Sequence, residues 1–300
     1  MHSTLMIFID GVGIGENDPK KNPFFNGRLN FAKIIFGASP HLGDQHLQSD
    51  NKYLFPVDAC MGVKGLPQSG TGQTSIFCGV NAPKINKGHF GPYPPAALKQ
   101  TLKEKNIFRE FLNRNLNVEF VNAYPKIFFD YINSGRKRLS ATSLSCLLSG
   151  VKLKNSTDLR RGQALSAEID NSRWVNKLNY THKIIKPETA ANRLFKIAQR
   201  NHFTLFEYFL TDHIGHGRIK DEADATLKVL DKFLIHVLRN IPKNISLIIC
   251  SDHGNIEDMS VKMHTRNPAL GITAGLHAEE LSQKINSLYD IKNSILGYYS

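Results

Sequence analysis

The sequence alternates short apolar runs with longer stretches in which apolar residues recur at helical spacing. The apolar runs, each typical of a buried strand, are residues 5–10, 117–124, 203–210 and 244–250. Amphipathic helices are predicted over residues 96–116, 188–200 and 221–240, and the last has acidic residues in its first turn. This alternation predicts an α/β fold of three layers, α/β/α, with a mainly parallel central sheet covered by helices on both faces.

The stretch 125–185 departs from this alternation and is rich in Ser, Asn, Arg and Lys. We interpret it as an insertion or a reduced cap on a core formed by residues 1–124 and 186–300. The chain has 300 residues, of which 41% are hydrophobic, so it can bury a sizeable core.

The charge of the chain is strongly positive, with 38 Lys and Arg against 26 Asp and Glu, a formal net charge of +12. Such a charge attracts anions, including phosphorylated metabolites and nucleic acids. The basic residues are scattered, and neither a zinc-finger spacing nor an RNP-like aromatic pattern is present. A small anionic substrate is therefore favoured over a nucleic acid as the partner.

Several absences in the sequence bear on where the protein acts. No apolar run approaches the roughly 18 residues that a membrane helix needs. The first ten residues lack the basic segment of a signal peptide, and the four cysteines are far apart without a CxxC pair. We expect a cytoplasmic protein that does not interact with a membrane.

Acidic residues follow three of the predicted strands. Asp10 follows the first apolar run, Asp212 the third and Asp252 the fourth. Histidines follow closely, at positions 213, 216, 253 and 264. Ligands of open α/β sheets bind at the carboxyl ends of the strands, and carboxylate oxygens with imidazole nitrogens suit Zn²⁺ or Mn²⁺ better than Ca²⁺. Although Asp and His are also common in turns, their repetition after strands favours a site for a pair of metal ions.

A glycine-rich segment, residues 64–79, contains the sequence SGTGQ. A Ser or Thr in a tight turn before a helix can offer its hydroxyl to a metal ion and its backbone amides to an anion. Metal coordination lowers the pKa of a hydroxyl and makes it a nucleophile near neutral pH. Ser69 and Thr71 are both candidates for this role, and a flexible turn is the structural alternative. The segment is not a Walker loop.

These motifs together resemble the alkaline phosphatase superfamily. DGVGIG, SGTGQ, DHIGHG, SDHGN and the later HT occur in the order used by that superfamily, between positions 10 and 265. The sequence is most similar to the branch of cofactor-independent phosphoglycerate mutase and phosphopentomutase. The resemblance implies two divalent metal ions, Mn²⁺ or Zn²⁺. The ligands that it implies are Asp10, Ser69, Asp252 and His253 for one ion, and Asp212, His216 and His264 for the other. His213 falls between ligands and is left out.

The resemblance also indicates which hydroxyl is the nucleophile. The mutases place it three residues before a glycine, and Gly72 puts Ser69 in that position, with Thr71 as the fallback. The histidine that follows this glycine in the mutases is Gln73 here. This departure weakens the transfer of the mutase activities but not of the metal site.

The activity implied is that of a two-metal phosphohydrolase or phosphotransferase, which acts on a small phosphate ester through a phosphoserine at Ser69. The insertion of about 60 residues leaves room only for a small cap. An open site admits water and favours hydrolysis over a mutase cycle. A phosphomutase of the phosphosugar or phosphoglycerate type is the alternative within this superfamily. A non-catalytic protein that binds anions or nucleic acid on the same fold is the alternative from another class.

Substrate selection is expected to depend on basic residues of the insertion, because guanidinium groups bind phosphate in a bidentate manner. A solvated basic face is the alternative for each residue. The residues are Arg136, Lys137, Arg138, Arg160 and Arg161, with His89 as a further candidate from the loop after the nucleophile.

Overall fold

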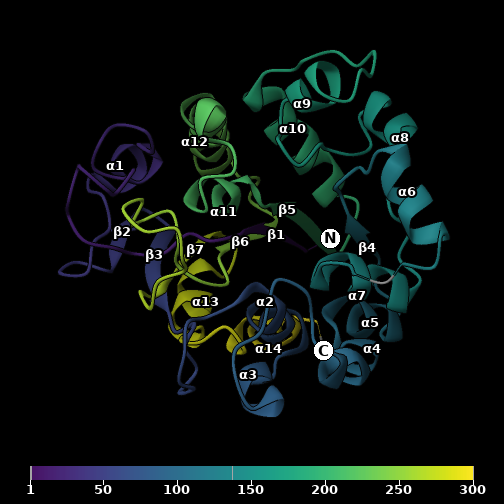
Figure 1. The fold of residues 1–300 in the computed structure, drawn as a ribbon, viewed down its shortest axis with the longest axis horizontal. Coiled ribbons are helices and arrows are strands. Elements are labelled where there is room, and N and C mark those ends of the chain that lie inside the picture. The colour runs from purple at the N-terminus through teal and green to yellow at the C-terminus, as the bar shows by residue number, and fades with distance from the viewer. Residues whose placement is uncertain (1, 137, 300) are drawn as a thin grey trace.

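A seven-stranded sheet runs through the centre of the computed structural model, which describes residues 2–136 and 138–299 (Figure 1). The strands lie in the order β2 (Leu47–Ser49), β3 (Lys52–Val57), β7 (Ala269–Gly275), β6 (Ile245–Cys250), β1 (Ser3–Ile9), β5 (Phe203–Tyr208) and β4 (Val118–Phe120). Strands β6, β1, β5 and β4 are parallel neighbours, whereas β7 is antiparallel to both β6 and β3, and β2 is antiparallel to β3. β3 therefore points the same way as the four parallel strands. The predicted α/β fold with a mainly parallel sheet is confirmed.

Helices cover both faces of the sheet, as the apolar runs predict (Figure 1). In β1, Leu5 and Ile7 belong to one hydrophobic core and Met6 and Phe8 to the other, because successive side chains of a strand point to opposite faces. The first core is completed by α1 (Phe31–Phe36), α10 (Pro187–Ala198) and α12 (Ala223–Arg239). The second is completed by α2 (Ser69–Cys78), α4 (Lys99–Lys105), α5 (Ile107–Asn113), α7 (Ala141–Ser149), α13 (Ala278–Lys284) and α14 (Asp290–Leu296).

The helix predicted over residues 96–116 is broken into three pieces. A 3-10 turn, η1 (Ala96–Leu98), precedes α4, and α5 begins after Asn106. The Asn106 side chain accepts a hydrogen bond from the backbone N–H of Arg109 at 3.1 Å and so caps α5. Asn106 therefore starts a new helix where the apolar spacing alone predicts a continuous one.

The stretch predicted as an insertion contains four helices and, among its described residues, no strand of the sheet. The helices are α6 (Lys126–Asn133), α7, α8 (Ser156–Arg160) and α9 (Ser172–Asn176). Ala141 and Cys146 on α7 are buried in the second core. The helix α7 is therefore part of the core. The limits of a separate cap, residues 125–185, stay a prediction.

The remaining helices are short, and they are α3 (Ala82–Asn86), α11 (Leu210–Gly215) and the 3-10 turn η2 (Lys220–Glu222). In the described part of the chain, no helix has both the length and the apolar character needed to span a membrane. All four cysteines are free thiols, three of them buried.

Candidate metal centre

Three aspartates that follow neighbouring strands meet at one edge of the sheet. Asp10 comes directly after β1, and Asp252 comes shortly after the end of β6. Asp212 lies in α11, just after β5. Because β1 pairs in parallel with both β6 and β5, the three carboxyl ends are adjacent. The backbone N–H of Gly11 donates to Asp252 Oδ1 at 3.3 Å, and a Cβ at Gly11 would lie 3.2 Å from Asp212. The strand order therefore accounts for the gathering of acids far apart in sequence.

The first group of predicted ligands surrounds His253. Its Nε2 lies 3.3 Å from Asp10 Oδ1, 3.5 Å from Asp252 Oδ2 and 3.0 Å from Ser69 Oγ. Ser69 is the first residue of α2, whereas the Thr71 hydroxyl donates to the backbone carbonyl groups of Gln68 and Phe90. Of the two candidate hydroxyls, that of Ser69 is therefore the one placed among the acids and imidazoles.

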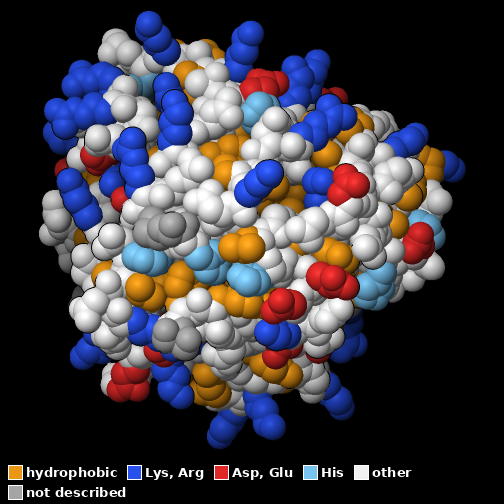
Figure 2. Space-filling view, turned by 180° about the vertical axis from the view of Figure 1, so that it is seen from behind, with side chains coloured by type: hydrophobic (Ala, Val, Ile, Leu, Met, Phe, Trp, Pro, Cys, Tyr) orange, Lys and Arg blue, Asp and Glu red, His pale blue; other side chains and the backbone are white. Residues whose placement is uncertain are grey.

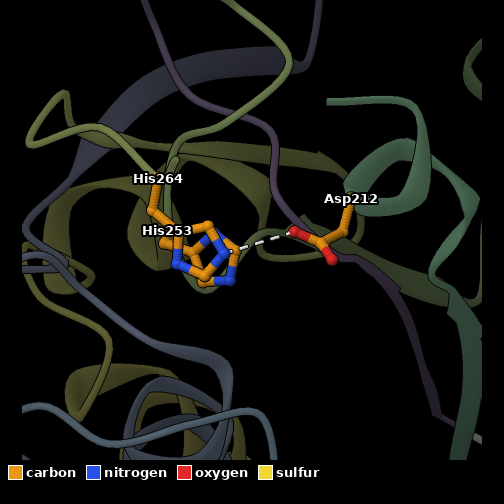
Figure 3. A group of neighbouring side chains, drawn as sticks. All are labelled: Asp212, His253 and His264. Carbon is orange, nitrogen blue, oxygen red and sulfur yellow. Dashed lines mark ion pairs between the residues drawn. The ribbon is translucent and has the colours of Figure 1, made fainter. Parts of the chain in front are cut away.

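The second group surrounds Asp212. Its Oδ1 lies 3.2 Å from His216 Nε2 and 3.4 Å from His264 Nε2, and these two nitrogens are 3.1 Å apart. Figure 3 shows His253 and His264 lying over one another, with the Asp212 carboxylate pointing toward them. The two rings stack with centroids 3.7 Å apart, so that His253 joins the first group to the second.

Backbone carbonyl groups orient two of these imidazoles. His216 Nδ1 lies 2.6 Å from the carbonyl oxygen of Lys262, and His264 Nδ1 lies 2.7 Å from that of Pro67. A carbonyl oxygen only accepts, so each Nδ1 carries a proton, and in the neutral ring the Nε2 lone pair is then available to a metal ion. This is the arrangement by which metal-binding histidines are usually fixed.

The protonation states of these residues show whether the site fits a cation. Burial raises the pKa of Asp10 well above its usual value, and the carboxylates of Asp252, Asp212 and Glu207 raise it further. Asp10 Oδ1 is buried and has no hydrogen-bond partner.

Burial lowers the pKa of His253, which favours the neutral, metal-binding form. For Asp212, burial acts to raise the pKa, but the hydrogen bonds from His264 and Asn255 and the nearby imidazoles lower it overall. Burial acts to lower the pKa of His264, but its hydrogen bonds to Asp212 and to the Pro67 carbonyl raise it overall. Two sets of carboxylates and imidazoles fit divalent ions, one formed by Asp10, Asp252 and His253 and the other by Asp212, His253 and His264.

Gln73 occupies the position where the mutases have a histidine. Its Nε2 lies 3.3 Å from Asp10 Oδ2 and 3.3 Å from Asp252 Oδ2, and its side chain is buried. The amide thus donates to both carboxylates of the first group without adding charge. A Cβ at the preceding Gly72 would lie 3.0 Å from the Asp252 carbonyl oxygen, so the glycine lets α2 approach Asp252 closely.

Glu257 ties together the loops that carry the site, a role that the sequence analysis missed. Its carboxylate accepts hydrogen bonds from the backbone of Gly13 at 3.0 Å and of Asn255 at 2.7 Å. It also accepts from the side chains of Thr265 and Asn267, the latter at 3.0 Å. The side chain is fully buried. Glu257 therefore links the loop after Asp10, the loop after His253 and the segment after His264.

A buried glutamate on β5, Glu207, lies outside both predicted groups. Its Oε1 accepts a hydrogen bond from the Thr142 hydroxyl at 3.0 Å. Burial raises the pKa of Glu207 to about 7, and the Asp252 charge contributes to the increase.

The raised pKa of Glu207 predicts a pH dependence of stability. Because the folded-state pKa exceeds the unfolded one, the stabilising contribution is complete below about pH 4.5 and is lost as the pH rises through 7. Relative to Glu207→Gln, the metal-free wild type should lose about 3 kcal/mol of unfolding free energy between pH 4.5 and 8. Urea unfolding at a series of pH values measures this difference, with Glu279→Gln, at an exposed position, as the control. Parallel pH profiles for wild type and Glu207→Gln would contradict the prediction.

The predicted substrate-binding residues form contacts other than those of the ligand groups. Figure 2 shows Lys and Arg side chains over much of one face of the molecule. Arg136 lies over the Tyr131 ring at 5.5 Å, and Arg160 lines a hollow with Arg193 and His182. His89 Nε2 lies 3.3 Å from the Val63 carbonyl oxygen. Arg138 and Arg161 are exposed, and Lys137 lies outside the described residues. Among the described contacts, none joins these residues to the ligand groups, so their role stays a prediction.

Two further residues, His213 in α11 and Arg218 shortly after it, lie near the ligand groups. The His213 ring packs beside the Phe209 ring, with centroids 5.3 Å apart, and is not in either ligand group. Arg218 was not singled out from the sequence, although it directly follows the DHIGHG motif. Its Nη1 lies 3.9 Å from Asp212 Oδ2, which places an exposed cation at the edge of the site.

Part of the chain is similar in sequence to a family of metalloenzymes, and its fold is similar to those of two enzymes of known structure. Residues 163–299 match the family model described as the Metalloenzyme superfamily. The alkaline phosphatase of the Antarctic bacterium TAB5 is 12% identical, with 99% of this chain and 98% of that chain covered and a TM-score of 0.54. The lipoteichoic acid synthase LtaP of Listeria monocytogenes is 10% identical, with 98% and 71% covered and a TM-score of 0.50. No curated protein sequence matches the chain. The likeness to these structures confirms the predicted alkaline phosphatase-like fold, and the family-model match over residues 163–299 agrees with the resemblance noted in the sequence.

Proposed function

We propose that this protein is a two-metal phosphohydrolase or phosphotransferase that acts on a small phosphate ester through a phosphoserine at Ser69. The observation that carries the proposal is the position of the Ser69 hydroxyl. It is buried at the first turn of α2, 3.0 Å from His253 Nε2, within the group formed by Asp10 and Asp252. The Metalloenzyme superfamily match supports the metal dependence.

The metal ions would be held by the two groups described above. The first group is Asp10, Ser69, Asp252 and His253. The second group is Asp212, His216 and His264. When bound, divalent ions supply positive charge that stabilises phosphoryl transfer and lowers the pKa of a coordinated hydroxyl. The choice between Mn²⁺ and Zn²⁺ is part of the test below.

The residues of the chain then carry the following roles. Ser69 Oγ gives up its proton, attacks phosphorus in line with the leaving oxygen and forms the Oγ–phosphorus bond. The bond between phosphorus and the leaving oxygen breaks, and that oxygen takes up a proton from water. Gln73 holds the carboxylates of Asp10 and Asp252 in place. Water, or the hydroxyl of a second substrate, then takes the phosphoryl group from Ser69 and restores the free serine.

Hydrolysis is preferred to a mutase reaction because Gln73 replaces the histidine of the mutases. Free phosphate should therefore appear faster than an isomerised product when phosphate esters are supplied. Faster isomerisation would instead favour the phosphomutase alternative. Binding to nucleic acid that weakens with salt and requires no metal would favour the non-catalytic alternative.

Metal content tests the two ligand groups directly. After loading with Mn²⁺ or Zn²⁺ and dialysis, the wild type is expected to retain about two ions per chain. Asp212→Asn/His216→Ala should retain about one, because it removes a carboxylate and an imidazole from one group only. Elemental analysis measures both, and the double variant Asp221→Asn/His46→Ala, at two exposed positions, serves as the control. Two ions in the Asp212 variant, or none in the wild type, would contradict the assignment.

A further inference from the structure

A hollow away from the metal centre lies between α4, α7 and the end of α6. Its volume is about 440 Å³, which is within the range of small-molecule sites in proteins. Apart from backbone at Gly135, its lining consists of aliphatic side chains and basic or amide side chains. The aliphatic residues are Ile132, Leu139, Leu144, Leu147 and Leu148, and the basic or amide residues are Lys99, Gln100, Lys103 and Arg136.

The aliphatic part of the hollow belongs mainly to the outer face of α7. The inner face of this helix supplies Thr142, Ser145 and Cys146, all fully buried. Leu144, Leu147 and Leu148 recur at helical spacing on the opposite side, and Leu147 is 42% exposed. Leu144 and Leu148 are half-buried and pack against the edge of the second core, so that their outer sides and the exposed Leu147 form an apolar surface that favours contact with an apolar ligand.

The basic part of the hollow consists of two lysines and an arginine. Lys99 and Lys103 are exposed and one helical turn apart on α4, and Arg136 is exposed beyond α6. In the described part of the chain, none of the three forms an ion pair, and no carboxylate lines the hollow. The nearby Glu104 accepts a hydrogen bond from Gln100. The charge of the lining thus complements an anion.

We propose that this hollow binds a fatty acid of medium chain length, with its tail on the leucines of α7 and its carboxylate beside Lys99 and Lys103. A flexible aliphatic chain matches a lining that contains leucine and isoleucine but no aromatic ring. A purely polar anion would leave the leucines uncovered, and a neutral apolar ligand would leave the three cations unpaired. The proposal is independent of the phosphotransfer activity, because none of the lining residues belongs to the metal centre.

Calorimetric titration of the full chain with decanoate and dodecanoate, both below their micelle concentrations, tests the proposal. We expect one site per chain and an affinity that rises about fourfold with each added methylene group. Lys99→Gln/Lys103→Gln should weaken dodecanoate binding roughly tenfold but leave dodecanol binding unchanged. Leu147→Gln should weaken both ligands, and Lys84→Gln, an exposed lysine on α3, should weaken neither.

Three results would overturn the proposal. The first is no saturable binding of either fatty acid. The second is binding of dodecanol as tight as that of dodecanoate, because the basic residues would then have no role. The third is binding to vesicles of anionic lipid without binding of the monomeric acids, which would indicate a membrane-facing surface instead. Circular dichroism of each variant confirms that the fold is intact, since every substituted side chain is exposed.

Discussion

Ser69→Ala is expected to lower turnover of a phosphate ester by at least about 10³-fold while about two metal ions per chain remain bound. The hydroxyl that would form the covalent intermediate is removed, whereas Asp10, Asp252 and His253 continue to supply carboxylate and imidazole ligands. Steady-state kinetics and elemental analysis on the same preparation measure the two effects separately. Trapping of phosphate on the protein by acid quench should succeed with wild type and fail with Ser69→Ala.

Thr71→Val is the matched control for this experiment. It also removes a hydroxyl from the first turns of α2, but the Thr71 hydroxyl donates to backbone carbonyl groups rather than to the metal centre. Its turnover should stay within about threefold of wild type. If Ser69→Ala keeps wild-type turnover, and Thr71→Val loses it, the nucleophile is Thr71 instead.

Glu257→Ala is expected to destabilise the protein by about 4 kcal/mol or more. The substitution leaves the buried N–H groups of Gly13 and Asn255 without an acceptor, together with the side chains of Thr265 and Asn267. Each unsatisfied buried donor costs about 1–3 kcal/mol. Urea unfolding of the metal-free protein measures the loss, and Glu279→Ala, at an exposed position, should change stability by no more than about 0.5 kcal/mol.

Glu257→Gln separates the loss of hydrogen bonds from the loss of volume. The amide keeps one acceptor oxygen but turns an N–H donor toward groups that also donate, so an intermediate loss of stability is expected. A cost below about 1 kcal/mol for Glu257→Ala would show that water replaces the carboxylate and that the loops do not depend on it.

The sequence predicts the central strands and the gathering of acids because both depend on local patterns. A buried parallel strand is a continuous apolar run, as in residues 5–10, and an aspartate after such a run lies at the ligand-binding edge. β7 was not predicted, because its residues alternate small with apolar side chains. Position 271 requires a small residue because of the neighbouring strand β3. A Cβ at Gly271 would lie 2.7 Å from the side chains of Phe55 and Val57 on β3. No pattern within residues 269–275 contains that information.

The supporting residues of the metal centre are equally invisible to local patterns. Gln73 was noted only as a departure from the mutases, although its amide contacts two carboxylates 63 and 179 positions away in sequence. Glu257 is close to the SDHGN motif, but its partner Gly13 is 244 positions away. The ligand residues form recognisable motifs, whereas the contacts that fix them exist only in the folded chain.

The strand order that unites Asp10, Asp212 and Asp252 also determines how folding and ion binding are linked. The proposed ligands extend from position 10 to position 264, so closing the site requires pairing of β1 with both β5 and β6. A fragment from either half of the chain lacks the complete first group, Asp10, Ser69, Asp252 and His253, and contacts of this sequence separation form slowly. An ion bound there would oppose unfolding of the entire sheet, with a gain that grows as the logarithm of its concentration. Depletion of the ion would then accelerate hydrogen exchange throughout the sheet, including strands that hold no ligand.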